Sequence, residues 1–280
     1  MDSQQLATFE TVITEGSFDA AARALHITPS AVSQRIKALE QAVGQVLVRR
    51  TKPAEPTEAG QALVRLASQI ALLSREALDA ARGTATGGRI SLVVNADSLH
   101  TWFLPVLTAV PGVSFDVHQD DQDYTADLLR AGTVMAAVTA QRVPVQGCRV
   151  EELGSMRYLA AAAPGVFADY ATTPMIVLNR KDRLQHRFLA EMAGATQSAV
   201  AGGGGDPPVH YIPAAAAFVE AIKLGLGWGM VPEQVLGDLA EIAPGRHLDV
   251  PLYWQCWRME SVGLQALTAA VKAAAATALR

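Results

Sequence analysis

Residues 26–40 read HITPSAVSQRIKALE, a polar segment with apolar residues at helical spacing. Thr28 is a favoured N-cap residue and Pro29 a favoured first helical residue, so a helix is predicted to begin here and to end at Gly44. At about 100° per residue, one face of this helix is polar and the opposite face is apolar. The polar face carries Ser30, Ser33, Gln34, Lys37 and Gln41, and the apolar face carries Val32, Ile36, Leu39 and Val43.

The polar face lies in a context that favours DNA binding. A solvated helix face usually mixes acids with bases, but this face carries no acid. A predicted helix, SFDAAARAL (17–25), precedes it, and a basic β-excursion, VLVRRTKPAEP (46–56), follows it. This is the layout of a helix-turn-helix with a basic wing, in which serine and glutamine read base edges and basic side chains hold phosphates or guanine. The candidate DNA-contacting residues are Thr28, Pro29, Ser30, Ser33, Gln34, Arg35, Lys37, Arg49 and Arg50.

The charge distribution supports a local rather than a general polyanion-binding surface. The 280-residue chain has a net charge of −4, yet residues 21–52 hold six Lys/Arg and one acid, a net of +5. The two cysteines form no CxxC pair, which is typical of a reducing compartment. Neither a leader segment nor an 18-residue apolar run is recognisable, so we expect a cytoplasmic protein without a membrane partner.

A long helix follows the wing. Thr57 is its expected N-cap, and it is predicted to run to about Arg82. Its apolar residues alternate in steps of three and four, which is the a/d pattern of a coiled coil and predicts a dimer seam. The alternative is a helix that lies on its own domain. The seam residues are Leu63, Leu66, Ile70 and Leu73, continued by Ala77 and Ala80.

After a Gly/Thr-rich hinge at 83–89 the pattern changes to short apolar runs alternating with helical stretches. This alternation predicts mostly parallel sheets covered by helices on both faces. The predicted strands are 90–95, 113–118, 134–140, 156–163, 174–179 and 227–232, and the predicted helices are 98–109, 123–131, 182–193, 214–224 and 263–279.

The N-terminal motifs resemble those of LysR-type transcriptional regulators. The matching residues are Thr28, Ala31, Val32, Ser33, Ile36, Leu39, Glu40, Thr57 and Gly60. Val48 departs from the family, which often has Phe before the arginine that corresponds to Arg49. The resemblance covers the whole chain and includes FVEAIKLGLGWGMVPEQV (218–235).

The resemblance implies an α+β multidomain fold. A winged helix-turn-helix (1–57) and a linker and dimerisation helix (58–82) would precede the hinge (83–89). An effector-binding domain (90–280), similar to two-lobed α/β periplasmic binding proteins, would follow. Its first lobe would span about 90–163 and 246–280, and its second about 164–245, joined by two crossover strands.

Three further segments are similar to the lysine- and arginine-responsive branch of that family, the ArgP/LysG regulators. They are VNADSLHTWFLPVL (94–107), DDQD (120–123) and LDVPLYWQCWRMES (248–261), the last containing the branch's Tyr-Trp-Gln-x-Trp strand. The implied role is to sense L-lysine or L-arginine and to activate a gene for amino-acid export.

A candidate effector site follows the first strand of the regulatory half. Asp97 and Ser98 begin a helix there, and a helix N-terminus is a favourable position for an α-carboxylate, although either residue is equally explained as an N-cap. In the LysR-type family this loop borders the effector cleft. Asp97, Asp120 and Asp123 are the candidate partners of a cationic side chain, unless the acids only favour a helix start. Thr139 and the aromatic wall residue Trp102 complete the predicted site.

Other functional classes receive less support from the sequence. No nucleophile–base pair or cofactor motif indicates an enzyme, and the scattered histidines indicate no metal site. A solute-binding protein would have similar lobes but no helix-turn-helix, and a LysR-type regulator with a different small effector stays open. The expected partners are therefore a double-stranded DNA operator, an amino-acid effector, a second copy of the chain (with tetramers common in the family) and, for an activator, RNA polymerase. No cofactor is expected.

Overall fold

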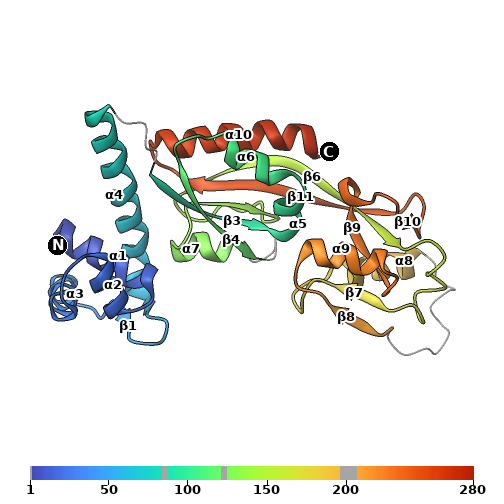
Figure 1. Cartoon of the computed structure of the whole chain (residues 1–280), viewed down its shortest axis with the longest axis horizontal. Coiled ribbons are helices and arrows are strands. Elements are labelled where there is room, and N and C mark those ends of the chain that lie inside the picture. The colour runs from blue at the N-terminus through green and yellow to red at the C-terminus, as the bar shows by residue number, and fades with distance from the viewer. Residues whose placement is uncertain (1, 84–87, 121–124, 196–206) are drawn as a thin grey trace.

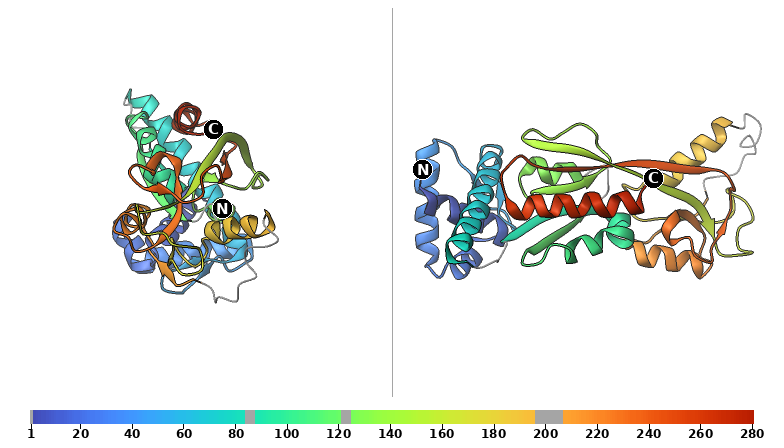
Figure 2. Two further views of the ribbon diagram at one scale, coloured as in Figure 1. Left: turned by 90° about the vertical axis from the view of Figure 1, so that its right-hand side faces the viewer. Right: turned by 90° about the horizontal axis from the view of Figure 1, so that it is seen from above.

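The computed structural model describes residues 2–83, 88–120, 125–195 and 207–280. Three parts follow one another along the long axis of the molecule: an N-terminal helical unit, the upright helix α4, and an α/β part with two lobes (Figure 1). The view from above shows the C-terminal helix α10 lying along the first lobe (Figure 2). This order agrees with the α+β multidomain organisation expected from the sequence.

The N-terminal unit is a helix-turn-helix with a two-stranded wing. It contains α1 (Ser3–Glu15), α2 (Phe18–Ala24) and α3 (Pro29–Val43), and β1 (Val48–Arg49) pairs antiparallel with β2 (Glu55–Pro56). The predicted caps are confirmed: Ser17 Oγ accepts from Ala20 N, and Thr28 Oγ1 accepts from Ala31 N. Gly44 ends α3 with a φ of 77°, a conformation that favours glycine. Local sequence signals therefore set the ends of these helices.

Helix α4 (Glu58–Arg82) begins at the predicted cap, where Thr57 Oγ1 accepts from Gly60 N. Val64 and Ala67 are buried in the core of the N-terminal unit, whereas Leu72 belongs to the core of the α/β part. Gly60 lies so close to the wing that a Cβ there would stand 2.3 Å from the Leu47 carbonyl oxygen. The helix therefore packs against both parts of the chain.

The α/β part contains one mixed sheet, with strand order β4-β3-β5-β11-β6-β9-β7-β8 and with β10 paired to β6. Its strands are β3 (Arg89–Asn95), β4 (Ser114–Asp120), β5 (Ala136–Thr139), β6 (Cys148–Ala162), β7 (Met175–Val177), β8 (Val209–Tyr211), β9 (Trp228–Pro232), β10 (Ala240–Glu241) and β11 (His247–Trp257). Within each lobe the pairs β3–β4, β3–β5, β7–β8 and β7–β9 are parallel, as predicted.

The expectation of mostly parallel pairing is wrong for the two long strands that join the lobes. β6 and β11 run antiparallel to each other, and each also pairs antiparallel with a strand of one lobe. Their pairing joins residues from 88 positions apart (Leu159 with His247) to 109 positions apart (Cys148 with Trp257), which the alternation of short apolar runs cannot indicate. β11 contains the Tyr-Trp-Gln-x-Trp segment, so the strand expected there from the resemblance is confirmed.

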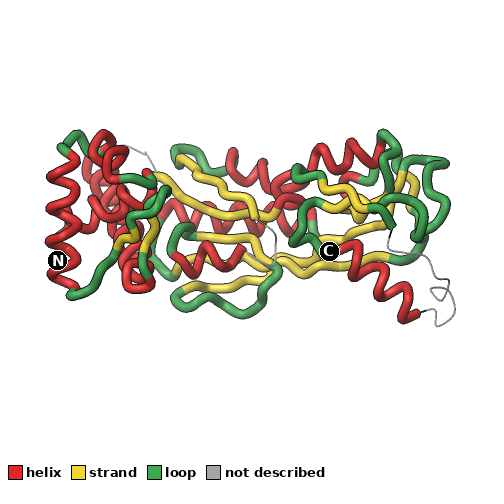
Figure 3. The backbone as a smooth tube through the Cα atoms, turned by 90° about the horizontal axis from the view of Figure 1, so that it is seen from below, coloured by secondary structure: helices red, strands yellow, loops and turns green. Residues whose placement is uncertain are grey.

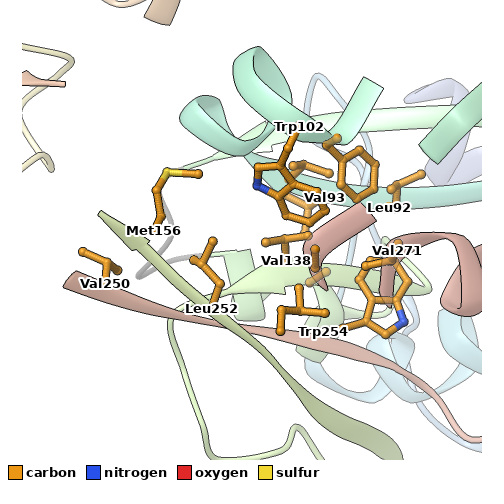
Figure 4. Close-up of a cluster of buried hydrophobic side chains, with 14 of the residues drawn as sticks. Leu92, Val93, Trp102, Val138, Met156, Val250, Leu252, Trp254 and Val271 are labelled. Carbon is orange, nitrogen blue, oxygen red and sulfur yellow. The ribbon is translucent and has the colours of Figure 1, made fainter. Parts of the chain in front are cut away.

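The helices lie on the outer sides of the sheet in both lobes (Figure 3). The first lobe carries α5 (Ala96–Ser98), the π-helical turn η1 (Leu99–Phe103), α6 (Leu104–Thr108), α7 (Thr125–Ala131) and α10 (Val262–Ala278). The second lobe carries α8 (Leu184–Ala195), α9 (Ala215–Lys223) and the 3-10 turn η2 (Glu233–Val235). A close-up of the buried cluster shows Trp102 beside Val93, and Trp254 of β11 beside Val271 of α10 (Figure 4). The core of the first lobe therefore holds β3 and the helical turns that follow it.

Candidate functional site

Helix α3 presents the predicted polar face to the outside. Val32, Ile36 and Leu39 are buried, each at most 1% exposed, and hold the helix on the core of the N-terminal unit. On the opposite side Ser30, Gln34, Lys37 and Gln41 are exposed and Ser33 is half-buried, together with the exposed Thr28 and Pro29 at the start of the helix. This arrangement leaves a row of hydrogen-bonding side chains free to enter a major groove.

Two charged residues of α3 hold the unit together. Arg35 is half-buried, and its Nη1 donates to Thr8 Oγ1 of α1 at 3.3 Å. The Glu40 carboxylate accepts from the backbone N–H groups of Leu47 at 2.9 Å and Val48 at 3.4 Å. Arg35 therefore has an internal contact beside its predicted contact with DNA, and Glu40 fixes the wing to α3.

The wing displays its basic residues at the surface. Arg49 pairs with Glu55 across the two strands at 2.9 Å, and both side chains are about half exposed. The Arg50 guanidinium lies 4.6 Å from the centre of the Phe18 ring, which orients it by a cation–π contact. Both arginines thus stand on the same small unit as the polar face of α3.

A cleft lies between the two lobes, with a space of about 560 Å³ that includes open solvent. The first lobe contributes Asn95 and Asp97, and the second contributes Arg183 and Arg187. The remaining lining residues are Ala96, Leu178, Asp182, Leu184, Phe218 and Met230. The cleft therefore combines groups of both charges with an apolar wall, which suits a zwitterionic ligand with an aliphatic stem.

On the first-lobe side of the cleft, some polar groups have hydrogen-bond partners and others have none among the described residues. Tyr158 Oη of β6 donates to Asp97 Oδ2 at 2.7 Å, so this carboxylate is oriented. Asn95 is 3% exposed and Ser98 is fully buried, and within the described residues neither Asn95 Oδ1 nor Ser98 Oγ has a hydrogen-bond partner. Buried polar atoms without partners are uncommon in folded proteins, so Asn95 is a candidate ligand contact. Ser98 belongs to α5, the helical turn that follows Asn95.

Asp120 ends β4 and is the Cα partner of Asn95 at the end of β3. Its Oδ1 lies 3.0 Å from Lys181 Nζ of the second lobe. Asp123, the third predicted acid, lies outside the described residues. The strand ends therefore bring Asp120 beside Asn95, as parallel pairing requires.

Of the predicted effector residues that the structure describes, Asp97 lines the cleft, Asp120 lies beside it, and Ser98, Trp102 and Thr139 lie in the interior of the first lobe. Trp102, in the π-helical turn, is 5% exposed and packs edge-on against Phe103. Thr139, at the end of β5, is fully buried, and its Oγ1 accepts from Gln141 N at 3.1 Å. A contact of any of these residues with an effector stays a prediction.

The predicted seam of α4 is only partly covered within one chain. Leu63 and Leu66 pack at the edge of the N-terminal core, whereas Ile70 is 37% and Leu73 is 41% exposed. An apolar stripe on a helix that its own chain does not cover is typical of an association surface. The dimer seam stays a prediction, and the exposure of Ile70 and Leu73 supports it.

Several cleft residues were not predicted from the sequence. Arg183 and Arg187 line the cleft, and Lys181 and Tyr158 contact the acids Asp120 and Asp97. All four lie more than sixty residues from Asp97 along the chain. The run RKDR at 180–183, directly after a predicted strand, was the available signal. Charged residues at the end of a strand lie at the edge of the sheet where α/β proteins bind ligands.

The two cysteines do not face each other. Cys256 is the Cα partner of Arg149, so the neighbouring Cys148 points to the opposite face of the sheet. Burial raises the pKa of Cys148 to about 11 and also raises the pKa of Cys256, which disfavours a reactive thiolate. Within the described part of the chain no His/Cys/Asp/Glu group could hold a metal ion, and no helix is long and apolar enough to cross a membrane.

Comparison with known protein families decides the classification. Residues 3–61 match the bacterial regulatory helix-turn-helix protein model of the lysR family, and residues 83–279 match the LysR substrate binding domain. The chain belongs to the LysR family. The polar face of α3 lies in the part of the chain that matches the helix-turn-helix model, and the interlobe cleft lies in the part that matches the substrate binding domain.

Relatives within the LysR family are similar over almost the whole chain. The HTH-type transcriptional regulator LysG of Mycobacterium tuberculosis is 47% identical, over 98% of this chain and 94% of that protein. The lysine export transcriptional regulatory protein LysG of Corynebacterium glutamicum is 42% identical, with full coverage of both. A structure of full-length LysG from C. glutamicum with the bound effector Arg superposes with a TM-score of 0.79 at 41% identity, covering 100% of both chains. These relatives bear the names of regulators, not of enzymes.

Proposed function

We propose that this LysR-family regulator senses a basic amino acid, L-arginine or L-lysine, in the cleft between its lobes and changes its action on DNA in response. The observation that carries the proposal is the presence of opposite charges on the two sides of the cleft. The carboxylates of Asp97 and Asp120 belong to the first lobe, and Arg183 and Arg187 belong to the second. A ligand with one carboxylate and two cationic groups matches this set.

Each part of such a ligand has a candidate partner. Asn95 Oδ1, buried and unpartnered among the described residues, suits the α-ammonium group. Arg183 and Arg187 suit the α-carboxylate, because guanidinium groups bind carboxylates in a two-pronged manner. Asp97 and Asp120 suit the side-chain cation. The arginine named in the LysG structure supports this reading, since that protein is similar to this chain over its full length.

We assign a task to each of the domains expected from the sequence. Residues 1–57 would bind an operator through α3 and the wing, and residues 58–82 would pair two copies along the seam. The effector domain, 90–280, would move the paired DNA-binding units. Residues 84–87 of the hinge lie outside the described residues. The name of the C. glutamicum relative supports an exporter gene as the target, and activation by contact with RNA polymerase in the cytoplasm completes the proposal.

The direct test measures DNA binding with and without effector. Duplexes selected from a random library by the full-length chain provide the operator. Their affinity is then measured by fluorescence anisotropy with L-arginine, L-lysine or L-leucine. We expect arginine or lysine to change the affinity or the footprint, and leucine to have no effect. An equal response to all three would favour a different effector, and selection without enrichment would contradict DNA recognition.

A further inference from the structure

A cation of the second lobe contacts one of the proposed effector-binding acids directly beside the residues that line the cleft, since Asp120 is the strand partner of Asn95 and Lys181 precedes Asp182. Lys181 follows β7 of the second lobe, and its Nζ lies 3.0 Å from Oδ1 of Asp120, which ends β4 of the first lobe. The two residues are 61 positions apart in the chain. The ion pair therefore links the two lobes beside the cleft.

The turn that carries Lys181 is held by its own hydrogen bonds. Asn179 Oδ1 accepts from Lys181 N at 2.7 Å and from Asp182 N at 3.1 Å. The carboxylate of Asp182 accepts from Leu178 N at 2.9 Å and from Leu184 N at 3.0 Å. These bonds fix the backbone on both sides of Lys181, so its ammonium group is directed from an ordered turn.

The chemistry of this contact duplicates that of the proposed ligand. The ammonium group of Lys181 is the same group that the side chain of L-lysine carries, and the guanidinium of L-arginine binds the same kind of carboxylate. Asp120 neighbours Asn95, which lines the cleft, so an effector bound at Asn95 reaches the region of Asp120. The side-chain cation of the effector and the ammonium group of Lys181 would then compete for the Asp120 carboxylate.

We propose that Lys181 is an internal competitor of the effector, which occupies Asp120 in the unliganded protein and is displaced when a basic amino acid binds. The inference rests on the proposed function and names the residue that sets the effector concentration at which the protein responds. The side chains of Lys181 and Asp120 are 49% and 29% exposed, and pairs exposed to this extent exchange partners at small cost. Displacement also releases a link between the lobes, so binding and lobe movement are coupled through one ion pair.

Calorimetric titration of L-arginine into wild type, Lys181→Met and Lys181→Arg tests the proposal. The Met variant keeps an unbranched apolar side chain without the charge, and the Arg variant keeps the charge. We expect Lys181→Met to bind arginine about fivefold more tightly, the factor that corresponds to about 1 kcal/mol for a partly exposed ion pair. Lys181→Arg should stay within about twofold of wild type on the same basis. Melting curves check folding, and Lys181→Gln replaces the Met variant if that variant does not fold.

The outcomes separate this inference from the proposed function. Wild type that binds arginine, with Lys181→Met binding equally or more weakly, would overturn the competitor role and leave the proposed function standing. Wild type that binds neither arginine nor lysine would remove the proposed function and the competitor role with it.

Discussion

Arg65 of the linker helix α4 donates a hydrogen bond of 3.2 Å from Nη2 to the carbonyl oxygen of Leu129, in the last turn of α7 of the first lobe. Its Nη1 donates to the carbonyl oxygen of Gln146 at 2.5 Å. Both Gly132 and Gly147 have positive φ and pass so close that an added Cβ would lie 3.1 Å from Arg65 N and 2.9 Å from Arg65 Nη1, respectively. The turns of the first lobe thus form a socket for this side chain.

A second tether joins α4 to the same lobe eleven residues further on. The Glu76 carboxylate accepts from Ser261 Oγ at 2.6 Å and from Gly263 N at 3.1 Å, at the N-terminus of α10. Two fixed points about three helical turns apart define the orientation of α4 relative to the lobe. We therefore expect movement of the first lobe to be transmitted to the helix that carries the DNA-binding unit.

The first prediction concerns this transmission. Replacing Arg65 by Met removes two charge-assisted hydrogen bonds, each contributing about 1.5–3 kcal/mol, which is comparable to typical coupling energies of about 1–3 kcal/mol. We expect the variant to bind operator DNA without effector as wild type does, but the ratio of affinities with and without arginine should approach one. Arg82→Met, in the exposed last turn of the same helix, is the control. An undiminished response in Arg65→Met would show that the socket does not transmit the signal.

The second prediction concerns the DNA-contacting face. Lys37 is exposed between Ser33 and Gln41 on the polar face of α3. If Lys37 holds a phosphate, Lys37→Ala should lower the affinity for all duplexes alike, by about tenfold near 0.1 M salt. The slope of log affinity against log salt concentration should fall in magnitude by about one. Anisotropy titrations at several salt concentrations measure both, with Lys223→Ala of the second lobe as control. A change confined to particular base sequences would assign Lys37 to base reading instead.

The helix ends could be predicted from the sequence, whereas the contacts between distant segments could not. Caps such as Thr28 and Thr57 act on N–H groups three residues away, so the helix ends were predictable from local sequence. The antiparallel pairing of β6 with β11 and the contact of Lys181 with Asp120 join distant segments, and no periodic pattern encodes them. The chemistry at the cleft was therefore only half visible: the acids of the first lobe were predicted, and the bases of the second were not.

The third prediction concerns association. Ile70 is 37% exposed in the single chain, so Ile70→Lys removes little from its own core but places a charge in the proposed seam. Sedimentation velocity should show a dimer or tetramer for wild type and a shift towards monomer for the variant. Leu224→Lys, at a 79% exposed position of the second lobe, controls for the added charge. Equal masses for both variants would place the association surface elsewhere.

The fourth prediction concerns pH. Glu10 of α1 lines a space of about 1090 Å³, open solvent included, shared with Arg75, Arg89 and Asp116. Burial raises the pKa of Glu10, and the charges of Arg89 and Arg75 oppose this rise only in part. Since the folded state then holds the proton more tightly than the unfolded state, the contribution of Glu10 to stability is present below its unfolded pKa and lost as the pH rises through the folded pKa.

Glu10→Gln removes the loss of stability that ionisation of Glu10 causes as the pH rises. The variant should therefore melt at a higher temperature than wild type near pH 7.5, and the difference should shrink as the pH approaches about 4.3, the ordinary pKa of glutamate. Thermal unfolding at a series of pH values measures it, and Glu15→Gln, at an exposed position at the end of α1, is the control. A difference that is independent of pH would argue against a buried Glu10 carboxylate.

The central claim is that the cleft selects a cationic side chain. Calorimetric titration of the wild-type chain with L-arginine and with L-citrulline, its uncharged isostere, tests this most directly, because the two ligands differ only at the group that Asp97 and Asp120 would bind. A neutral side chain leaves these carboxylates without a cationic partner, so we predict saturable binding of arginine that is at least about tenfold tighter than that of citrulline. Equal affinities, or tighter binding of citrulline, would contradict the claim.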